Sequence, residues 1–314
     1  MNSHAAYCAK VLVVAAVFAA AGKLALFNSF GCDAFDHDPA HYMAYCDADR
    51  HAHYDHAAFI YDLERGVRTS VDSAKVLFLG SSHIQVAMSS NALTAFEKNN
   101  PVARPYLMGF GYFEQDIFSA AVIRELRPAP RVVVINADPF FSDSASVHAR
   151  RLLHSHGTEL VNAIAKRTGH AMVESLCGGG TPSAVARRLC GTTGTLYRSR
   201  TDGRWISNAA RPLKDTLTTP KFNPDSSELA RYAANAARFV STFAIDRKCV
   251  VITLVPDGAV PESVARSIAA GIGATFIAPR LDGLGTSDGS HLDTGSAERW
   301  SAAFLEALGP VLRS

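Results

Sequence analysis

The stretch that decides the fold is Lys75-Val-Leu-Phe-Leu-Gly-Ser-Ser-His83. Its apolar half has the length and composition of a strand that is buried on both faces. Gly80 then permits a sharp turn, and Ser82 follows just beyond the carboxyl end of the strand, where open parallel sheets place their chemistry. We expect a helix over residues 84–96, with an early break at Ser89-Ser90-Asn91. The stretch therefore predicts a strand, a turn that carries a serine, and a helix.

Four further apolar runs repeat the strand pattern along the chain. They cover residues 104–108, 131–135, 249–255 and 274–278. The segments between them are helical in pattern, and in the clearest, residues 226–247, apolar residues recur at three- and four-residue steps. Apolar strands separated by amphipathic helices indicate a parallel sheet that is covered on both faces. We therefore predict an α/β domain over residues 71–314, in which three α/β/α layers surround a five-stranded parallel sheet.

One long segment, from about residue 141 to residue 222, breaks this alternation. It is rich in Arg, Ser, Thr and Gly, with three glycines in a row at 178–180. A connection of this length is more often functional than accidental. We expect the insertion to form a lid or a partner surface.

Size and charge limit the class of protein. The chain has 314 residues, of which 48% are hydrophobic, and this is enough for a full core in one large domain with extra segments. Lys and Arg number 31 against 29 Asp and Glu, and no basic stripe alternates with aromatic residues as in proteins that track phosphates. We do not expect nucleic acid as a partner.

The N-terminal region, residues 1–30, has a different composition. Residues 11–27 are apolar except for Lys23, and the run approaches the length of about 20 residues that a membrane-spanning helix needs. We expect an uncleaved single-pass anchor; a signal peptide cleaved near Ala19-Ala20-Ala21 and a buried helix are the alternatives. Lys10 before the run and aspartates after it favour an N-terminus inside the cell. The main domain is then periplasmic or extracellular, on the outer side of the inner or cytoplasmic membrane.

The six cysteines fit an exported protein. Cys32 with Cys46, and Cys177 with Cys190, are pairs of short separation that an oxidising compartment can close. Spacing alone does not fix a disulfide, so buried free thiols are the alternative.

Residues 31–70 form a polar segment between the anchor and the domain. Five of the chain's twelve histidines lie in it, interspersed with aspartates that include Asp36, Asp38, Asp47, Asp49 and Asp55; the histidines are His37, His41, His51, His53 and His56. Imidazole and carboxylate both ligate zinc, but these spacings match no closed zinc pattern. We expect a solvated juxtamembrane collar and no metal site.

A second short motif, Asp288-Gly-Ser-His291, offers a base for Ser82. A serine hydroxyl is a poor nucleophile until a base removes its proton, and the base needs a carboxylate to hold its tautomer. Asp288 and His291 can supply these parts. The alternatives are that Ser82 caps a helix and that the motif is an ordinary turn before the last helix. His83 adjoins Ser82, but neighbouring side chains on a turn usually point apart, so we expect it to face substrate or to be structural.

Donors for an oxyanion follow the next two strands. Gly109 and Gly111 in Met-Gly-Phe-Gly-Tyr expose backbone N–H groups, and Asn136 offers a side-chain amide. The choice between the two glycines stays open. Further residues are expected to line the site: His83, Tyr112, Asp138, Arg204 and Trp205.

The order Ser82, Gly109 or Gly111, Asn136 and Asp288-x-x-His291 resembles the SGNH, or GDSL-type, hydrolase superfamily. Its four sequence blocks carry a serine, a glycine, an asparagine and a DxxH pair in that order, and the resemblance runs from about residue 76 to the C-terminus. It implies a flavodoxin-like fold. It also implies that Ser82 is the nucleophile, His291 the base and Asp288 its orienting carboxylate. The N–H of Ser82, a glycine and Asn136 would form the oxyanion hole.

Two blocks depart from the family pattern. Gly80-Ser81-Ser82 replaces Gly-Asp-Ser, and Ile135-Asn136-Ala137-Asp138 replaces Gly-x-Asn-Asp. Gly-Ser-Ser is similar to the membrane-anchored branch of the superfamily, which includes the D-alanylation proteins of teichoic acids and the alginate O-acetylation proteins. The resemblance therefore points to acyl (acetyl) esters of an envelope or extracellular polysaccharide.

The implied reaction passes through an acyl-serine and needs no cofactor or metal. Transfer of the acyl group to water makes the protein an esterase, and transfer to a sugar hydroxyl makes it an O-acyltransferase. The implied partners are an acylated carbohydrate polymer, the membrane and a membrane-bound acyltransferase. The altered first block and the long insertion suggest an alternative from a different class, a catalytically weak SGNH-like module that binds the polymer or the acyltransferase. Nucleotide binding is not expected, because the first turn lacks the Gly-x-Gly-x-x-Gly pattern.

Overall fold

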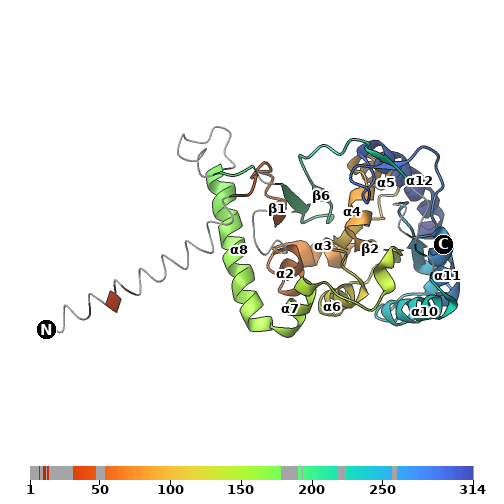
Figure 1. The fold of residues 1–314 in the computed structure, drawn as a ribbon, viewed down its shortest axis with the longest axis horizontal. Helices are drawn as coiled ribbons and strands as arrows, with labels where there is room; N and C mark the ends of the chain where they lie inside the picture. The colour runs from red at the N-terminus through yellow and green to blue at the C-terminus, as the bar shows by residue number, and fades with distance from the viewer. Residues whose placement is uncertain are drawn as a thin grey trace.

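A five-stranded sheet forms the centre of the molecule (Figure 1). The computed structural model describes residues 31–46, 54–177, 190–192, 194–217, 222, 224–256 and 260–313, together with Tyr7, Lys10, Val11 and Val13. The strands of the sheet are β2 (Val76–Ser81), β3 (Pro105–Phe110), β4 (Val132–Asn136), β8 (Val250–Thr253) and β9 (Thr275–Phe276). Every neighbouring pair is parallel. The predicted α/β class and five-stranded parallel sheet are confirmed.

The strand of this sheet that comes first in the chain lies inside it and not at its edge. The order is β3-β2-β4-β8-β9, so the first strand in the chain lies between the second and the third. This is the flavodoxin-like order, and its switch point lies between β2 and β4, where the connections leave in opposite directions. Ligands of open α/β sheets bind beyond the carboxyl ends of the strands at such a point. Ser82 follows β2 there, and Asp138 follows β4.

Alternate side chains of each strand enter two different cores. Leu77 and Leu79 of β2 enter one cluster, whereas Val76 and Phe78 enter the other. The second cluster is covered by α4 (Ser82–Ala87), α5 (Ser90–Asn99) and α12 (Thr294–Arg313). The first is covered by α2 (Tyr54–Ile60), α3 (Val67–Ser73), α6 (Asp116–Leu126), α10 (Ser226–Val240) and α11 (Glu262–Ile272). Figure 1 shows α4, α5 and α12 on one side of the sheet and α6, α10 and α11 on the other, as expected for three layers.

The helix expected over residues 84–96 is two helices, and the break falls where the sequence predicts it. The hydroxyl of Ser89 accepts a hydrogen bond from the Ala92 N–H and caps α5. The helix expected over residues 226–247 begins with a capping box of Asp225 and Glu228 and ends earlier, at Val240.

The expectation of a solvated collar over residues 31–70 differs from the structure. Strand β1 (His41–Cys46) pairs with β5 (Thr195–Ser199), and β5 pairs with β6 (Trp205–Ile206), in a small antiparallel sheet. Asp55 and His56 on α2 are fully buried. They tolerate burial because Asp55 accepts a hydrogen bond from the Arg198 guanidinium at 2.8 Å and His56 lies 3.1 Å from Glu114.

The remaining elements of the insertion pack around this small sheet or near the C-terminal loop. They are α7 (Val147–His154), α8 (His156–Cys177) and β7 (Asp215–Thr216), whereas the short 3₁₀ helix η2 (Pro139–Phe141) packs against α10. Strand β7 pairs with β10 (Gly285–Thr286). A 3₁₀ helix, η3 (Arg247–Cys249), leads into β8. Different parts of the insertion therefore contact different regions of the chain, β1 and α2 in one place and β10 in another.

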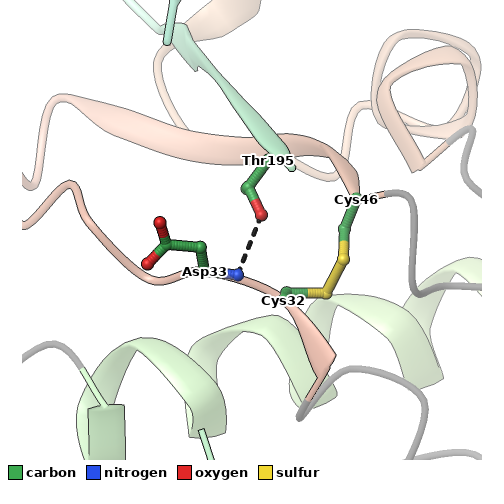
Figure 2. The surroundings of a disulfide bond; sticks show 4 residues. All are labelled: Cys32, Asp33, Cys46 and Thr195. Carbon is green, nitrogen blue, oxygen red and sulfur yellow. Dashed lines mark hydrogen bonds between the residues drawn. A yellow bond between two sulfur atoms is a disulfide. The ribbon is translucent and has the colours of Figure 1, made fainter. Parts of the chain in front are cut away.

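Two disulfides join the cysteine pairs considered from the sequence. Cys32 is bonded to Cys46, at the end of β1, and Cys177 is bonded to Cys190. Figure 2 shows the first bridge beside the hydrogen bond from the Asp33 N–H to the Thr195 hydroxyl, 3.0 Å long. Bridge and hydrogen bond together fasten the chain before β1 to the small antiparallel sheet.

The predicted N-terminal anchor falls outside the described residues, apart from four isolated positions. In the described part of the chain, no helix combines the length and the apolar character that crossing a bilayer requires.

Candidate functional site

Ser82 occupies the first position of α4, immediately after β2. The hydroxyl of Ser81 accepts the His83 N–H and caps this helix. Gly80 has a φ of 152°, and a Cβ there would lie 3.0 Å from the Cβ of Asn136 and 3.2 Å from the Cγ2 of Ile84. Only glycine fits this turn, and the turn presents Ser82 at the end of the sheet.

His291 links Ser82 to Asp288. Its Nε2 lies 2.8 Å from the Ser82 hydroxyl, and its Nδ1 lies 2.8 Å from Asp288 Oδ2. The other carboxylate oxygen of Asp288 accepts the backbone N–H groups of Ser290, at 3.0 Å, and of His291, at 2.7 Å. Gly289, with a φ of 81°, completes this turn. The Asp288–His291 motif is thus both a turn and a histidine-carboxylate pair. Together with Ser82, from a distant segment, it forms the serine-histidine-aspartate arrangement that activates serine nucleophiles.

The electrostatics of this line favour a neutral imidazole. Burial lowers the pKa of His291, and the nearby His83 and Arg211 lower it further against the raising effect of Asp288. The Asp288 carboxyl also has a lowered pKa, because burial is outweighed by hydrogen bonds from the His291 backbone and ring and from Ser290. With Nδ1–H directed at Asp288, Nε2 is free to accept the Ser82 proton.

His83 forms a second, buried line beside the first. Its Nδ1 lies 2.6 Å from Asp138 Oδ2, and its Nε2 lies 2.7 Å from the Ser290 hydroxyl. Its ring centre is 5.2 Å from that of His291. Asp138 also accepts a hydrogen bond from the Ser81 hydroxyl. His83 and Asp138 are almost completely buried, so they lie behind the nucleophile and do not line the cavity.

The two glycine candidates for the oxyanion hole have other contacts. The Gly111 N–H donates to the Tyr45 hydroxyl at 3.0 Å, so it is already used. Gly109 lies inside β3, where a Cβ would meet the Ser81 carbonyl oxygen at 2.6 Å. Its role is to let β3 approach the nucleophile turn. The geometry therefore does not fit Gly111 as an oxyanion donor and gives Gly109 a packing role.

Asn136 differs from the glycines because it has a spare donor. Its Oδ1 accepts the Val255 N–H at 2.8 Å, whereas its Nδ2 has no acceptor in the described part of the chain and is fully buried. Asn136 lies against Gly80, at the base of the nucleophile turn. An unpaired buried N–H is costly, and a developing negative charge would satisfy it.

An open pocket of about 860 Å³ lies over Ser82 and His291. Of the lining residues expected from the sequence, Tyr112 and Trp205 are on its wall. Arg204 is not, since its guanidinium forms an ion pair with Asp202. Sequence reasoning missed several residues of the wall: Tyr45, Asn91, Asn208, Arg211 and Glu298.

A buried network positions the wall of this pocket. The Tyr45 hydroxyl donates to Asp55 Oδ2 at 3.0 Å while it accepts the Gly111 N–H. The Arg198 guanidinium, on β5, also binds Asp55 and donates to the carbonyl oxygens of Leu107 and Gly109. Burial raises the pKa of Tyr45, so its hydroxyl stays protonated. Arg198, which belongs to the insertion, thus binds the end of β3 and holds in place the chain that continues to Gly111 on the pocket wall.

No group of three or more His, Cys, Asp or Glu side chains in the described ranges is arranged to hold a metal ion. Two histidines of residues 31–70 pair with carboxylates: His41 with Asp36, and His56 with Glu114.

No family model matches the chain, and comparisons with curated proteins and with solved structures returned no match either. The geometry of the site is therefore the basis on which a function can be inferred.

Proposed function

We propose that the chain is a serine-dependent enzyme of acyl-ester chemistry, similar to the SGNH hydrolases, that acts on an acylated carbohydrate polymer. The observation that carries the proposal is the line Ser82, His291 and Asp288, with both links at 2.8 Å and with Ser82 and His291 on the wall of an 860 Å³ pocket. Helix capping alone does not explain it, because Ser81, not Ser82, caps α4.

In the first half of the reaction, Ser82 Oγ attacks the ester carbonyl carbon and its proton passes to His291 Nε2. The carbonyl oxygen gains negative charge, and we assign the Ser82 N–H at the helix start and the unpaired Nδ2 of Asn136, at the base of the same turn, as its donors. The C–O bond to the polymer then breaks, and the departing sugar oxygen takes the proton from His291.

In the second half, an acceptor hydroxyl attacks the acyl-serine and gives its proton to His291. The acyl group then leaves Ser82, whose oxygen regains the proton. Water as acceptor gives ester hydrolysis, and a sugar hydroxyl gives O-acyl transfer. Asp288 holds the imidazole in the required tautomer throughout.

The pocket wall suits a carbohydrate. Three aromatic side chains, Tyr45, Tyr112 and Trp205, combine an apolar ring with a polar tip, and serine and asparagine residues line the same pocket. The ring centres of Tyr45 and Trp205 are 5.1 Å apart, and those of Tyr45 and Tyr112 are 5.9 Å apart. Such a wall can pack against the C–H faces of sugar rings while its polar groups bind hydroxyls.

We also propose that the reaction takes place outside the cytoplasm, with the chain held at the membrane by residues 11–27. The two disulfides favour an oxidising compartment. The apolar composition of residues 11–27 favours an anchor.

An active-site fluorophosphonate probe tests the proposal. The purified full-length protein should be labelled, and Ser82→Ala and His291→Ala should abolish labelling. Ser207→Ala is the matched control, since Ser207 lies on the same pocket wall and its hydroxyl accepts the Ala209 N–H. No labelling of a folded protein, together with unchanged polymer binding by Ser82→Ala, would instead support a module that binds polymer without catalysis.

A further inference from the structure

Helix α8 turns a nearly uncharged face away from the rest of the molecule. Its inner side packs against α2 and α7, and Figure 1 shows the helix along the edge of the molecule. The exposed residues that follow His156 in α8 are Gly157, Thr158, Val161, Asn162, Ile164, Arg167, Thr168, Ala171, Met172, Ser175 and Leu176. Among these residues Arg167 alone is charged, and it forms an ion pair with Glu64.

Other surface helices of this chain present charges to water, as surface helices usually do. The exposed residues of α10 include Arg231 and Arg238, and those of α12 include Glu298, Arg299 and Glu306. Helix α8 therefore differs from its neighbours in the chemistry of its outer face.

Large apolar side chains form a row along this outer face. Residues that recur at steps of three and four lie on one side of a helix. We call the following residues the α8 row: Val161, Ile164, Thr168, Met172 and Leu176. Its four apolar members are each between 44% and 66% exposed, and the row is about 22 Å long. A continuous exposed face of this kind marks an interaction surface.

The chain meets α8 shortly after residues 11–27, the segment proposed above as the membrane anchor. Cys32 and Val173 belong to one small buried cluster, against which Cys177 packs. Val173 and Cys177 are in the last turns of α8. Five residue steps separate residue 27 from Cys32, and they span at most about 18 Å when fully extended. The C-terminal part of α8 is therefore close to the point where the anchor would leave the bilayer.

We propose that the α8 row lies on the outer surface of the membrane, in contact with lipid. The inference rests on the proposed attachment by residues 11–27 and adds a second contact to it. Amphipathic helices bind membranes with their apolar side chains about 5–10 Å into the boundary between headgroups and acyl chains. Lipid would therefore remove the exposed side chains of the row from water.

A second contact would fix the orientation of the pocket above the bilayer. Val173 of α8 shares its cluster with Met43 of β1, and Tyr45 of the same strand lines the pocket. The small antiparallel sheet thus connects the α8 row to the wall of the site.

Quenching by brominated lipid tests the contact. The full-length protein would be placed in nanodiscs of phosphatidylcholine and phosphatidylglycerol, with or without bromine on the acyl chains. Met172→Trp and Leu176→Trp each add an indole to the row, and the signal of the native Trp205 and Trp300 is subtracted from the parent protein. We expect bromination to reduce the fluorescence that each substitution adds.

Val102→Trp is the matched control. Val102 is 69% exposed on the turn between α5 and β3, so an indole there is equally accessible but lies outside α8. Bromination should leave its added fluorescence unchanged.

Three results would overturn the inference about α8. Protein that does not enter the discs refutes the anchor and the second contact together. Protein that enters the discs without quenching at positions 172 and 176 keeps the anchor and removes α8 from the membrane, as expected if a second copy of the chain covers the row. Equal quenching at position 102 shows a contact that is not specific to α8.

Fluorophosphonate labelling in the same discs keeps this inference apart from the proposed enzyme activity. Labelled protein without quenching supports the activity and refutes the contact of α8 with lipid. Unlabelled protein with quenching at positions 172 and 176 supports the contact and refutes the activity.

Discussion

The Nε2 atom of His83 and the hydroxyl of Ser290 lie 2.7 Å apart, and a second serine–histidine contact, between Ser82 and His291, joins the same two segments. Helix α4 supplies Ser82 and His83, the C-terminal loop supplies Ser290 and His291, and each serine binds the histidine of the other segment. The loop that carries the base is therefore attached to the nucleophile helix by two hydrogen bonds. The one made by His83 is anchored in turn on Asp138.

Loss of the Ser290 hydroxyl should loosen the loop that carries the base. Ser290→Ala leaves the Nε2 atom of buried His83 without this partner, and we expect kcat for ester cleavage to fall by about 2- to 10-fold, the value of one hydrogen bond, with KM nearly unchanged. Ser290→Thr keeps a hydroxyl and should restore most of the rate. Identical rates for the Ala and Thr variants would show that the contact does not position His291.

Asp288→Asn should keep the fold and remove most of the activity. The carboxylate holds the Nδ1–H tautomer of His291 and stabilises the imidazolium that forms, so kcat should fall by about 10²- to 10⁴-fold. Thermal unfolding followed by circular dichroism provides the check on folding. A folded variant with nearly full activity would remove Asp288 from the mechanism.

The pH dependence of kcat/KM should place the acid limb below the ordinary histidine value of about 6.5. His291 acts as a base only when neutral, so activity is lost as pH falls through its pKa, and burial has lowered that pKa. Arg211→Met removes a positive neighbour, which should raise the pKa of His291 and move the acid limb to higher pH. A shift to lower pH, or an acid limb above 6.5 in the unmodified enzyme, would contradict this account of the base.

Gly109→Ala tests the approach of β3 to the nucleophile turn. The added Cβ would lie 2.6 Å from the Ser81 carbonyl oxygen, so strand or turn must move, at a cost of about 1–3 kcal/mol in the free energy of unfolding. We expect slower fluorophosphonate labelling of Ser82 as well. Gly157→Ala, on α8, is the control, because nothing lies within 4 Å of its Cβ. Equal effects at both positions would show that the close approach is unimportant.

The sheet was predictable from the sequence because its strands are continuous apolar runs. Buried parallel strands need apolar side chains on both faces, and residues 76–79, 132–135 and 250–252 have them. The short motifs around Ser82 and His291 were equally visible, because each follows a turn signal. Their hydrogen bond joins residues 209 positions apart, and it was suggested by the need of a serine for a base and by the order of the motifs along the chain.

The supporting residues could not be predicted, because their roles depend on contacts between distant segments. Polar composition suggested that Asp55 was exposed, whereas Arg198, 143 residues later, makes its burial tolerable. Tyr45 and Arg211 have no local pattern that distinguishes them from ordinary surface residues. Nor did the sequence show that the Gly111 N–H is occupied by Tyr45, because that contact spans 66 residues.

The most direct test of the central claim is to trap the acyl-enzyme. The full-length protein would be mixed with an excess of an acetyl ester, quenched in acid, and digested for peptide mass spectrometry. We expect one acetyl group on the peptide of α4, located at Ser82, and none in the Ser82→Ala variant. Acetyl on Ser81 or Ser290 instead, or continuing ester cleavage by Ser82→Ala, would contradict it.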